Sequence, residues 1–135
     1  MKLNHINIAV KDVVTTKEFL EKYFGLKCIA TAGNMFTALN DDDGLLFNLI
    51  KDENASYPDT FHIGFPQEDE ESVDKIYETL KEDGFEVWEP ALALGSYTFY
   101  FKSPGEFTIE IYTQAEEKTK TVVHPYFDDF SNKDK

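Results

Sequence analysis

Residues 3–10 have the sequence LNHINIAV, in which apolar and polar side chains alternate. Alternation with a period of two predicts a β-strand whose two faces differ in chemistry. One face would carry Ile6, Ile8 and Val10, and the other would carry His5, Asn7 and Ala9. We therefore expect the apolar face to pack against a helix and the opposite face to present an imidazole.

Two later stretches repeat this pattern and add two more groups that can bind a metal. Residues 61–65 (FHIGF) alternate apolar side chains with His62, and residues 107–112 (FTIEIY) alternate them with Glu110. Each predicted strand therefore carries one potential metal ligand opposite its apolar face. Together with His5, these residues form the constellation with the most evident chemistry in the sequence.

The segments between these strands predict a helix and three further strands in the first half of the chain. Thr15 and Glu18 have capping-box spacing, and Gly25 suits the end of a helix over about residues 15–24. Turn residues then separate three predicted strands, at residues 27–31, 35–39 and 45–51.

The second half of the chain repeats this order after a linker at residues 52–59. The strand with His62 is followed by an acidic helix start, an apolar helical stripe and a stop at Gly84. Three more strands are predicted, at residues 85–89, 97–102 and 106–113. His5 and His62 hold matching positions, 57 residues apart (62 minus 5), which indicates an internal repeat.

These elements predict an α+β fold of two βαβββ units, at about residues 1–51 and 60–113. Their strands would form a cupped mixed sheet with the helices outside, in one domain over residues 1–113. The C-terminal tail, residues 114–135, has mixed charge and is expected to be partly disordered. Within it Tyr126 belongs to a few apolar residues that could form a small packed extension.

The composition predicts a soluble, cytoplasmic protein that does not bind nucleic acid or membranes. The chain has 135 residues and a net charge of −13, which disfavours anionic partners. No apolar stretch approaches the ~20 residues that a membrane-spanning helix needs. All 13 basic residues are lysines, so the chain lacks the planar guanidinium that binds phosphate or carboxylate bidentately. The single Cys28 excludes an internal disulfide and is expected to be a small buried residue.

Two histidines and a carboxylate held on rigid strands are typical of a site for a divalent transition metal. A single histidine on a strand is more often a hydrogen-bonded structural residue than a ligand. Three such groups on one predicted face, two of them at matching repeat positions, favour metal binding. Positions left open on the ion would be available to water or substrate.

The sequence resembles the vicinal oxygen chelate superfamily, which includes glyoxalase I, extradiol dioxygenases, fosfomycin-modifying transferases and bleomycin-sequestering proteins. The resemblance covers residues 2–113 and rests on LNHINIAV, the FGL at 24–26, FHIGF, and TFYFKSPGEFTIEIY at 98–112. It implies that His5, His62 and Glu110 are the metal ligands. It also implies that Tyr100 lies beside the metal, as a tyrosine does in the transferase and dioxygenase branches.

The sequence departs from each enzymatic branch at particular positions. Asn48 stands where glyoxalase I has a fourth ligand such as Glu, and an amide cannot take up a proton as a carboxylate can. Glu89, Pro90 and Thr119 occupy regions where the transferases have basic residues for a phosphonate. Phe47 stands where the dioxygenases have a further histidine, although the two-His, one-carboxylate ligand set suits that branch best.

We therefore expect a metal-dependent enzyme that chelates two adjacent oxygens of a small organic substrate, through an Fe, Mn, Zn or Ni ion. Catalysis is assigned to Glu110 and Tyr100, and the predicted substrate pocket is lined by Asn7, Asn48, Trp88 and Tyr112. The alternative is a metal-free drug-binding protein of the bleomycin-resistance type, whose acidic surface would suit a cationic aromatic ligand. In either case we expect a homodimer, in which the cup is completed within one chain or between two.

Overall fold

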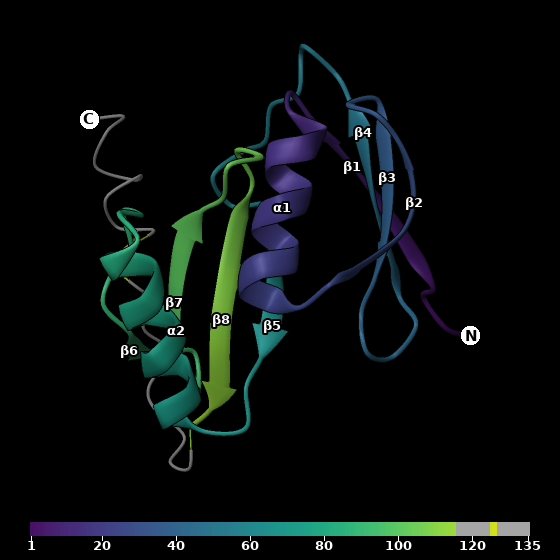
Figure 1. Ribbon diagram of the computed structural model, residues 1–135. Helices are drawn as coiled ribbons and strands as arrows, with labels where there is room; N and C mark the ends of the chain where they lie inside the picture. The colour runs from purple at the N-terminus through teal and green to yellow at the C-terminus, as the bar shows by residue number, and fades with distance from the viewer. Residues whose placement is uncertain (116–124, 127–135) are drawn as a thin grey trace. The chain divides into compact units, whose positions relative to one another are not determined.

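The computed structural model describes residues 1–115 and 125–126, which fall into two compact units (Figure 1). Unit 1 comprises Met1–Tyr57 together with Pro104–Glu106. Unit 2 comprises Pro58–Ser103 and the chain from Phe107 onward. Each unit contains one four-stranded sheet and one helix.

Unit 1 is a mixed sheet with a helix packed against it. Its strand order is β1-β4-β3-β2, with β1 parallel to β4 and the other pairs antiparallel. The helix α1 contacts β4, β3 and β2. A β-bulge between Cys28 and Ala30 interrupts the pairing of the edge strand β2. The elements are β1 (His5–Val10), α1 (Val13–Phe24), β2 (Lys27–Ala32), β3 (Phe36–Asn40) and β4 (Leu46–Lys51).

Unit 2 repeats this topology, with strand order β5-β8-β7-β6 and β5 parallel to β8. Its helix α2 packs on β7 and β8 (Figure 1). The predicted α+β fold of two βαβββ units is thereby confirmed. The elements are β5 (His62–Pro66), α2 (Glu70–Glu82), β6 (Ala91–Ala93), β7 (Ser96–Lys102) and β8 (Thr108–Gln114).

The burial of side chains follows the alternation predicted for the strands. In β1 the side chains of Ile8 and Val10 are buried, whereas His5 and Asn7 are exposed. In β8 the same alternation buries the two isoleucines and leaves Glu110 half-buried. The largest fully buried side chains come from both units: Ile8, Val10, Leu20, Leu39, Leu49, Leu80, Phe99, Phe101, Phe107, Ile109 and Ile111.

Helix α1 begins two residues before the predicted start, so the predicted capping box of Thr15 and Glu18 is wrong. The cap is Asp12, whose side chain accepts hydrogen bonds from the Thr15 backbone N–H at 3.0 Å and from the Thr15 hydroxyl at 2.9 Å. Asp69 caps α2 in the same way, through the Ser72 N–H at 2.8 Å. Gly25 ends α1 in the left-handed conformation, as predicted.

The strand predicted at residues 85–89 is also wrong. That segment makes one isolated bridge, between Val87 and Phe101, and the strand β6 lies further along the chain. Pro90 has no N–H with which to continue a ladder. At Leu94-Gly95, where φ is 52° and 80°, a turn then reverses the chain, so that Ala93 of β6 pairs with Ser96 of β7.

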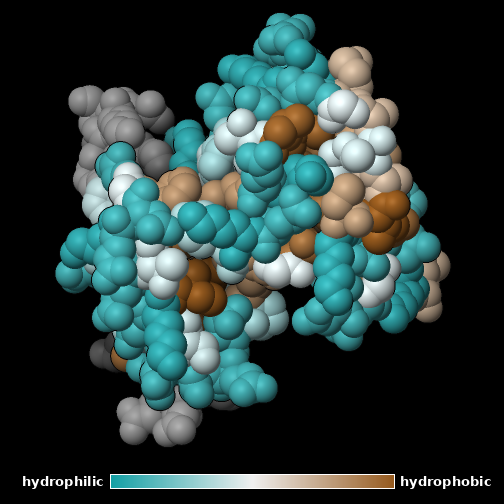
Figure 2. Space-filling model, viewed as in Figure 1, coloured by the Kyte–Doolittle hydropathy of each residue, from teal (hydrophilic) through white to brown (hydrophobic). Residues whose placement is uncertain are grey.

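The visible surface of the protein is mainly hydrophilic. Figure 2 shows one face covered mainly by hydrophilic residues, in keeping with 26 acidic side chains in the sequence. Among the residues described by the structure, no helix is long and apolar enough to cross a membrane.

Candidate metal and ligand site

The pairing of β5, β8 and β7 brings three predicted site residues together on one face of unit 2. Glu110 is paired with Gly64 on β5 and with Tyr100 on β7. His62 lies two residues before Gly64 on β5 and therefore points to the same face. The sheet thus collects His62, Glu110 and Tyr100 from three adjacent strands.

His62 and Glu110 face one another through atoms that can both bind a cation. The Nε2 atom of His62 lies 3.4 Å from Oε1 of Glu110, and their side chains are 34% and 16% exposed. The Nδ1 atom of His62 lies 3.1 Å from the carbonyl oxygen of Thr60. Because a carbonyl oxygen only accepts, Nδ1 carries a proton, and Nε2 is the ring nitrogen that faces Glu110. A positive group between Nε2 and Oε1, either a proton on the imidazole or a bound cation, would stabilise this approach.

Two hydroxyl groups hold the Glu110 carboxylate in place. The Thr98 hydroxyl donates to Oε2 at 2.7 Å, and the Thr98 side chain is buried. The Tyr100 hydroxyl also donates to this carboxylate, and the Tyr100 residue is 4% exposed. Burial, and then the hydrogen bond to Glu110, raise the pKa of Tyr100 well above its ordinary value. Tyr100 is therefore a neutral hydrogen-bond donor at neutral pH.

Gly64 provides the space that this arrangement requires. A Cβ atom at this position would lie 3.1 Å from Cε1 of Tyr112 and 3.7 Å from Oε1 of Glu110. The absence of a side chain therefore lets the Tyr112 ring lie close to the backbone of β5 and beside the carboxylate. Tyr112, predicted to line a substrate pocket, lies on the same face of β8 as Glu110.

His5 and the two predicted pocket asparagines lie in unit 1. His5 is exposed on β1, and its Nδ1 atom is 2.7 Å from Oδ1 of Asn4. Asn7 and Asn48 are paired across β1 and β4, and Nδ2 of Asn48 donates to Oδ1 of Asn7 at 2.9 Å. The other amide atom, Oδ1 of Asn48, is buried and has no hydrogen-bond partner. A buried acceptor in this state suits a ligand or water that donates to it.

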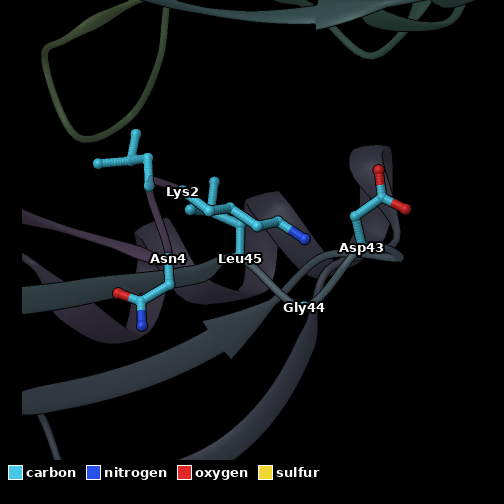
Figure 3. A pocket seen from close by; sticks show the side chains of 6 residues that line it. Lys2, Asn4, Asp43, Gly44 and Leu45 are labelled. Atoms are coloured by element: carbon cyan, nitrogen blue, oxygen red, sulfur yellow. The ribbon is translucent and has the colours of Figure 1, made fainter.

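A small cavity of about 300 Å³ lies in unit 1 near the start of β1 (Figure 3). Asn4, the hydrogen-bond partner of His5, is one of its lining residues. The complete lining is Lys2, Leu3, Asn4, Asp43, Gly44 and Leu45. The sequence analysis did not identify this cavity, because no pattern marks the contact of a chain terminus with a turn.

The predicted three-residue ligand set spans the two units, with His5 in unit 1 and the other two ligands in unit 2. Over residues 1–115 and 125–126, no group of three or more His, Cys, Asp and Glu side chains is placed to hold one ion. His62 and Glu110 are thus brought together within unit 2. The contribution of His5 remains a prediction.

The aromatic residues of the site include one that sequence analysis did not assign to it. Tyr126 is 2% exposed and stacks on Tyr100, with ring centroids 5.5 Å apart and an interplanar angle of 21°. Trp88, a predicted pocket residue, contacts Tyr126 edge-on at 6.4 Å between centroids. The predictions about the rest of the tail concern residues 116–124 and 127–135, which lie outside the described part of the chain.

Comparison with known proteins places the chain in a family. The sequence model of the Glyoxalase/Bleomycin resistance protein/Dioxygenase superfamily matches residues 2–111. No curated protein matches the sequence. A solved structure described as a possible glyoxalase from Bacillus cereus is 55% identical, covers 82% of this chain and 97% of its own, and has a TM-score of 0.79.

More distant solved structures share the fold. Lactoylglutathione lyase from Agrobacterium tumefaciens is 16% identical, with 83% of this chain and 92% of its own covered and a TM-score of 0.69. The fosfomycin resistance protein FosX from Listeria monocytogenes is 24% identical, with 87% and 94% covered and a TM-score of 0.71. From the match over residues 2–111, the chain belongs to the Glyoxalase/Bleomycin resistance protein/Dioxygenase superfamily.

Proposed function

We propose that the protein is a metal-dependent enzyme that acts on a small organic substrate with two adjacent oxygen atoms. The observation that supports this most directly is the approach of His62 Nε2 to Glu110 Oε1 at 3.4 Å, with Nδ1 directed to the Thr60 carbonyl. His62 and Glu110 would provide two ligands, and His5 would provide the third. The ion would be Fe, Mn, Zn or Ni.

The chemistry of these donors fits a divalent transition metal. A neutral imidazole that donates its other N–H to a carbonyl group is the usual form of a metal-binding histidine. Glu110 is likewise held by a hydrogen bond from Thr98, so both ligands are oriented before an ion binds. A glutamate-to-glutamine mutant of FosX, which has the same fold, has been solved in complex with Mn(II) and 1S,2S-dihydroxypropylphosphonic acid.

The bound ion and the other predicted site residues would each have a separate role in catalysis or substrate binding. A bound divalent ion would polarise the two substrate oxygens and lower the energy of negative charge that develops on them. Tyr100, whose hydroxyl donates to Glu110 in the structure, would turn this O–H to the same oxygens when the substrate binds. Glu110 is the candidate proton acceptor, because the amide of Asn48 cannot take up a proton. Trp88 and Tyr112 would contact the organic part of the substrate.

A second candidate function is metal-free binding of an aromatic compound. The cluster of Tyr100, Tyr126 and Trp88 favours it, because stacked rings offer contacts to a flat ligand. The net charge of −13 would attract a cationic compound. This function needs the aromatic residues but not His62.

Elemental analysis of protein purified without added metal distinguishes the two functions. The enzyme requires stoichiometric divalent metal, and this metal should be lost in His62→Ala and Glu110→Gln. Glu106→Gln is the matched control, since Glu106 is an exposed glutamate that pairs with Lys11 at 3.1 Å. Metal retained in both site variants, or absent from the wild-type protein after Mn(II) is supplied, would reject the proposal.

Mixing experiments test whether two chains complete the site. In a homodimer in which His5 of one chain joins His62 and Glu110 of the other, mixing His5→Ala with His62→Ala protein restores intact sites. We expect each variant alone to lack metal and the mixture, after dissociation and reassociation, to regain part of it. A mixture that stays without metal would indicate that each chain completes its own site.

A further inference from the structure

Tyr126 contacts the site face of unit 2 from beyond the residues that the family model matches. The family match ends at residue 111, whereas Tyr126 lies fifteen positions later (126 minus 111). Its side chain is nonetheless buried, at 2% exposure, and contacts the residue proposed to donate to the substrate.

Two other rings, those of His62 and Tyr126, contact the ring of Tyr100. The imidazole of His62 meets it edge-on, at 5.5 Å between centroids and an angle of 85°. The ring of Tyr126 stacks on it at 5.5 Å and 21°. A ring held in this way has little freedom to turn about its side-chain bonds, so its hydroxyl stays directed at Glu110.

Tyr126 is itself anchored to the strand that carries Glu110. Its hydroxyl lies 2.8 Å from the Thr108 hydroxyl, and Thr108 is paired with His62 across β8 and β5. Trp88 contacts the ring edge-on. The anchor therefore connects Tyr126 to β8 at the residue that is paired with His62.

We propose that Tyr126 is a positioning residue, which fixes the ring of Tyr100 beside Glu110. An effect of Tyr126 on substrate binding rests on the proposed function of Tyr100. The positioning of the Tyr100 ring is independent of that function, because it follows from contacts within unit 2. Tyr126 would affect the binding of a ligand with two adjacent oxygens more strongly than the binding of the metal alone, because Thr98 still holds the Glu110 carboxylate when Tyr126 is replaced.

The first test is nuclear magnetic resonance of full-length protein with labelled tyrosine rings. The Tyr100 signals are identified by their loss in Tyr100→Phe. Stacking should displace them upfield in the wild type, Tyr126→Leu should move them toward the position of an unstacked ring, and Tyr126→Phe should keep them displaced. Tyr57→Leu, which removes a half-buried tyrosine of unit 1, is the matched control. Unmoved Tyr100 signals in Tyr126→Leu would overturn the proposal.

The second test uses Mn(II) and nitrocatechol, a chromophoric chelator with two adjacent oxygens. Tyr126→Leu should still bind Mn(II), because Thr98 continues to hold Glu110, but the affinity of its Mn(II) form for nitrocatechol should fall by a larger factor than its affinity for Mn(II). The double variant with Tyr100→Phe should show no further loss, because both changes remove the same contact. Additive losses would contradict a role through Tyr100. If the wild type binds no Mn(II), the proposed function fails, and the resonance test still decides the role of Tyr126.

Discussion

The hydroxyl of Thr98 donates to Oε2 of Glu110 at 2.7 Å, while the other carboxylate oxygen, Oε1, faces His62 Nε2. One oxygen of the carboxylate is thus held by the protein, and the other is directed toward the proposed ion. The position of Glu110 therefore depends on Thr98, an uncharged residue that lies two places before Tyr100 on β7.

Thr98→Val should weaken metal binding without removing a ligand. Loss of a hydrogen bond that orients a ligand costs about 10–100-fold in metal affinity. The buried carboxylate oxygen also loses a partner, so the free energy of unfolding should fall by about 1–3 kcal/mol. Mn(II) titration and urea unfolding measure the two effects.

The control for that variant is Thr37→Val. Thr37 is fully buried in unit 1, and its hydroxyl lies 3.1 Å from the Thr31 hydroxyl. This substitution should lower stability by about 1 kcal/mol and leave the affinity for Mn(II) unchanged. Equal affinities for Mn(II) in Thr98→Val and Thr37→Val would show that Thr98 does not orient a ligand.

Tyr100→Phe should retain the metal and lose part of the interaction with the ligand oxygens. A hydrogen bond to a charged oxygen contributes about 1.5–3 kcal/mol, so the Mn(II) form should bind nitrocatechol roughly 10–100-fold more weakly. Absorption titration measures the affinity. Tyr97→Phe is the comparison, because the Tyr97 hydroxyl donates to Asp74 on α2 at 2.6 Å. Similar losses in both variants would remove Tyr100 from the site.

Gly64→Ala should disturb the site through the Tyr112 ring. The added Cβ would lie 3.1 Å from Cε1 of that ring, so the ring must move by a few tenths of an ångström. We expect a loss of about 1 kcal/mol in stability and a weaker affinity for Mn(II). The double variant with Tyr112→Leu should recover part of both losses. No recovery would mean that the close approach of the ring is not the cause.

The two aspartate caps should make the stability of the protein depend on pH in acid. Backbone and hydroxyl hydrogen bonds from Thr15 lower the pKa of Asp12, and those from Ser72 lower the pKa of Asp69. A lowered pKa in the folded state means that the stabilisation is present above the ordinary aspartate pKa and is lost as the pH falls through the lowered value. Urea unfolding from neutral to acidic pH should therefore show declining stability.

Asparagine at both caps tests this explanation. Asn is also a good N-cap residue but does not titrate, so Asp12→Asn/Asp69→Asn should retain helix capping and reduce the decline in acid. Asp59→Asn is the control, because Asp59 pairs with Lys102 at 3.8 Å outside any helix. An unchanged acid dependence in the double cap variant would assign the decline to other carboxylates.

The sequence was sufficient to predict the fold because apolar alternation and glycine stops are local signals. His62 and Glu110 could be assigned to the face opposite the apolar side chains in the same way, because alternate residues of a strand share a face. Tyr100 was assigned to the site through the resemblance to the superfamily. The prediction of a strand at residues 85–89 was wrong, because the apolar residues there have the pattern of a strand while Pro90 limits the pairing of the backbone. Asp12 was overlooked as a cap because Thr15 and Glu18 offered a competing motif.

The partners of the site residues could not be predicted in this way. Thr98 and Thr60 act through one hydroxyl and one backbone carbonyl, and neither residue stands out in the sequence. Tyr126 lies beyond the last strand in the sequence, and no local pattern there predicts its contact with Tyr100. Such contacts depend on tertiary packing, which leaves no periodic pattern.

The β-bulge in β2 has a consequence for how copies of the chain behave at high concentration. An edge strand with regular unpaired backbone groups can template cross-molecular sheet growth. The extra residue, Ile29, is 55% exposed and interrupts that regular row between Cys28 and Ala30. An exposed apolar side chain at the edge of the sheet is thus tolerated without promoting association. The irregular backbone beside it gives an approaching strand no continuous row of hydrogen-bonding groups to pair with.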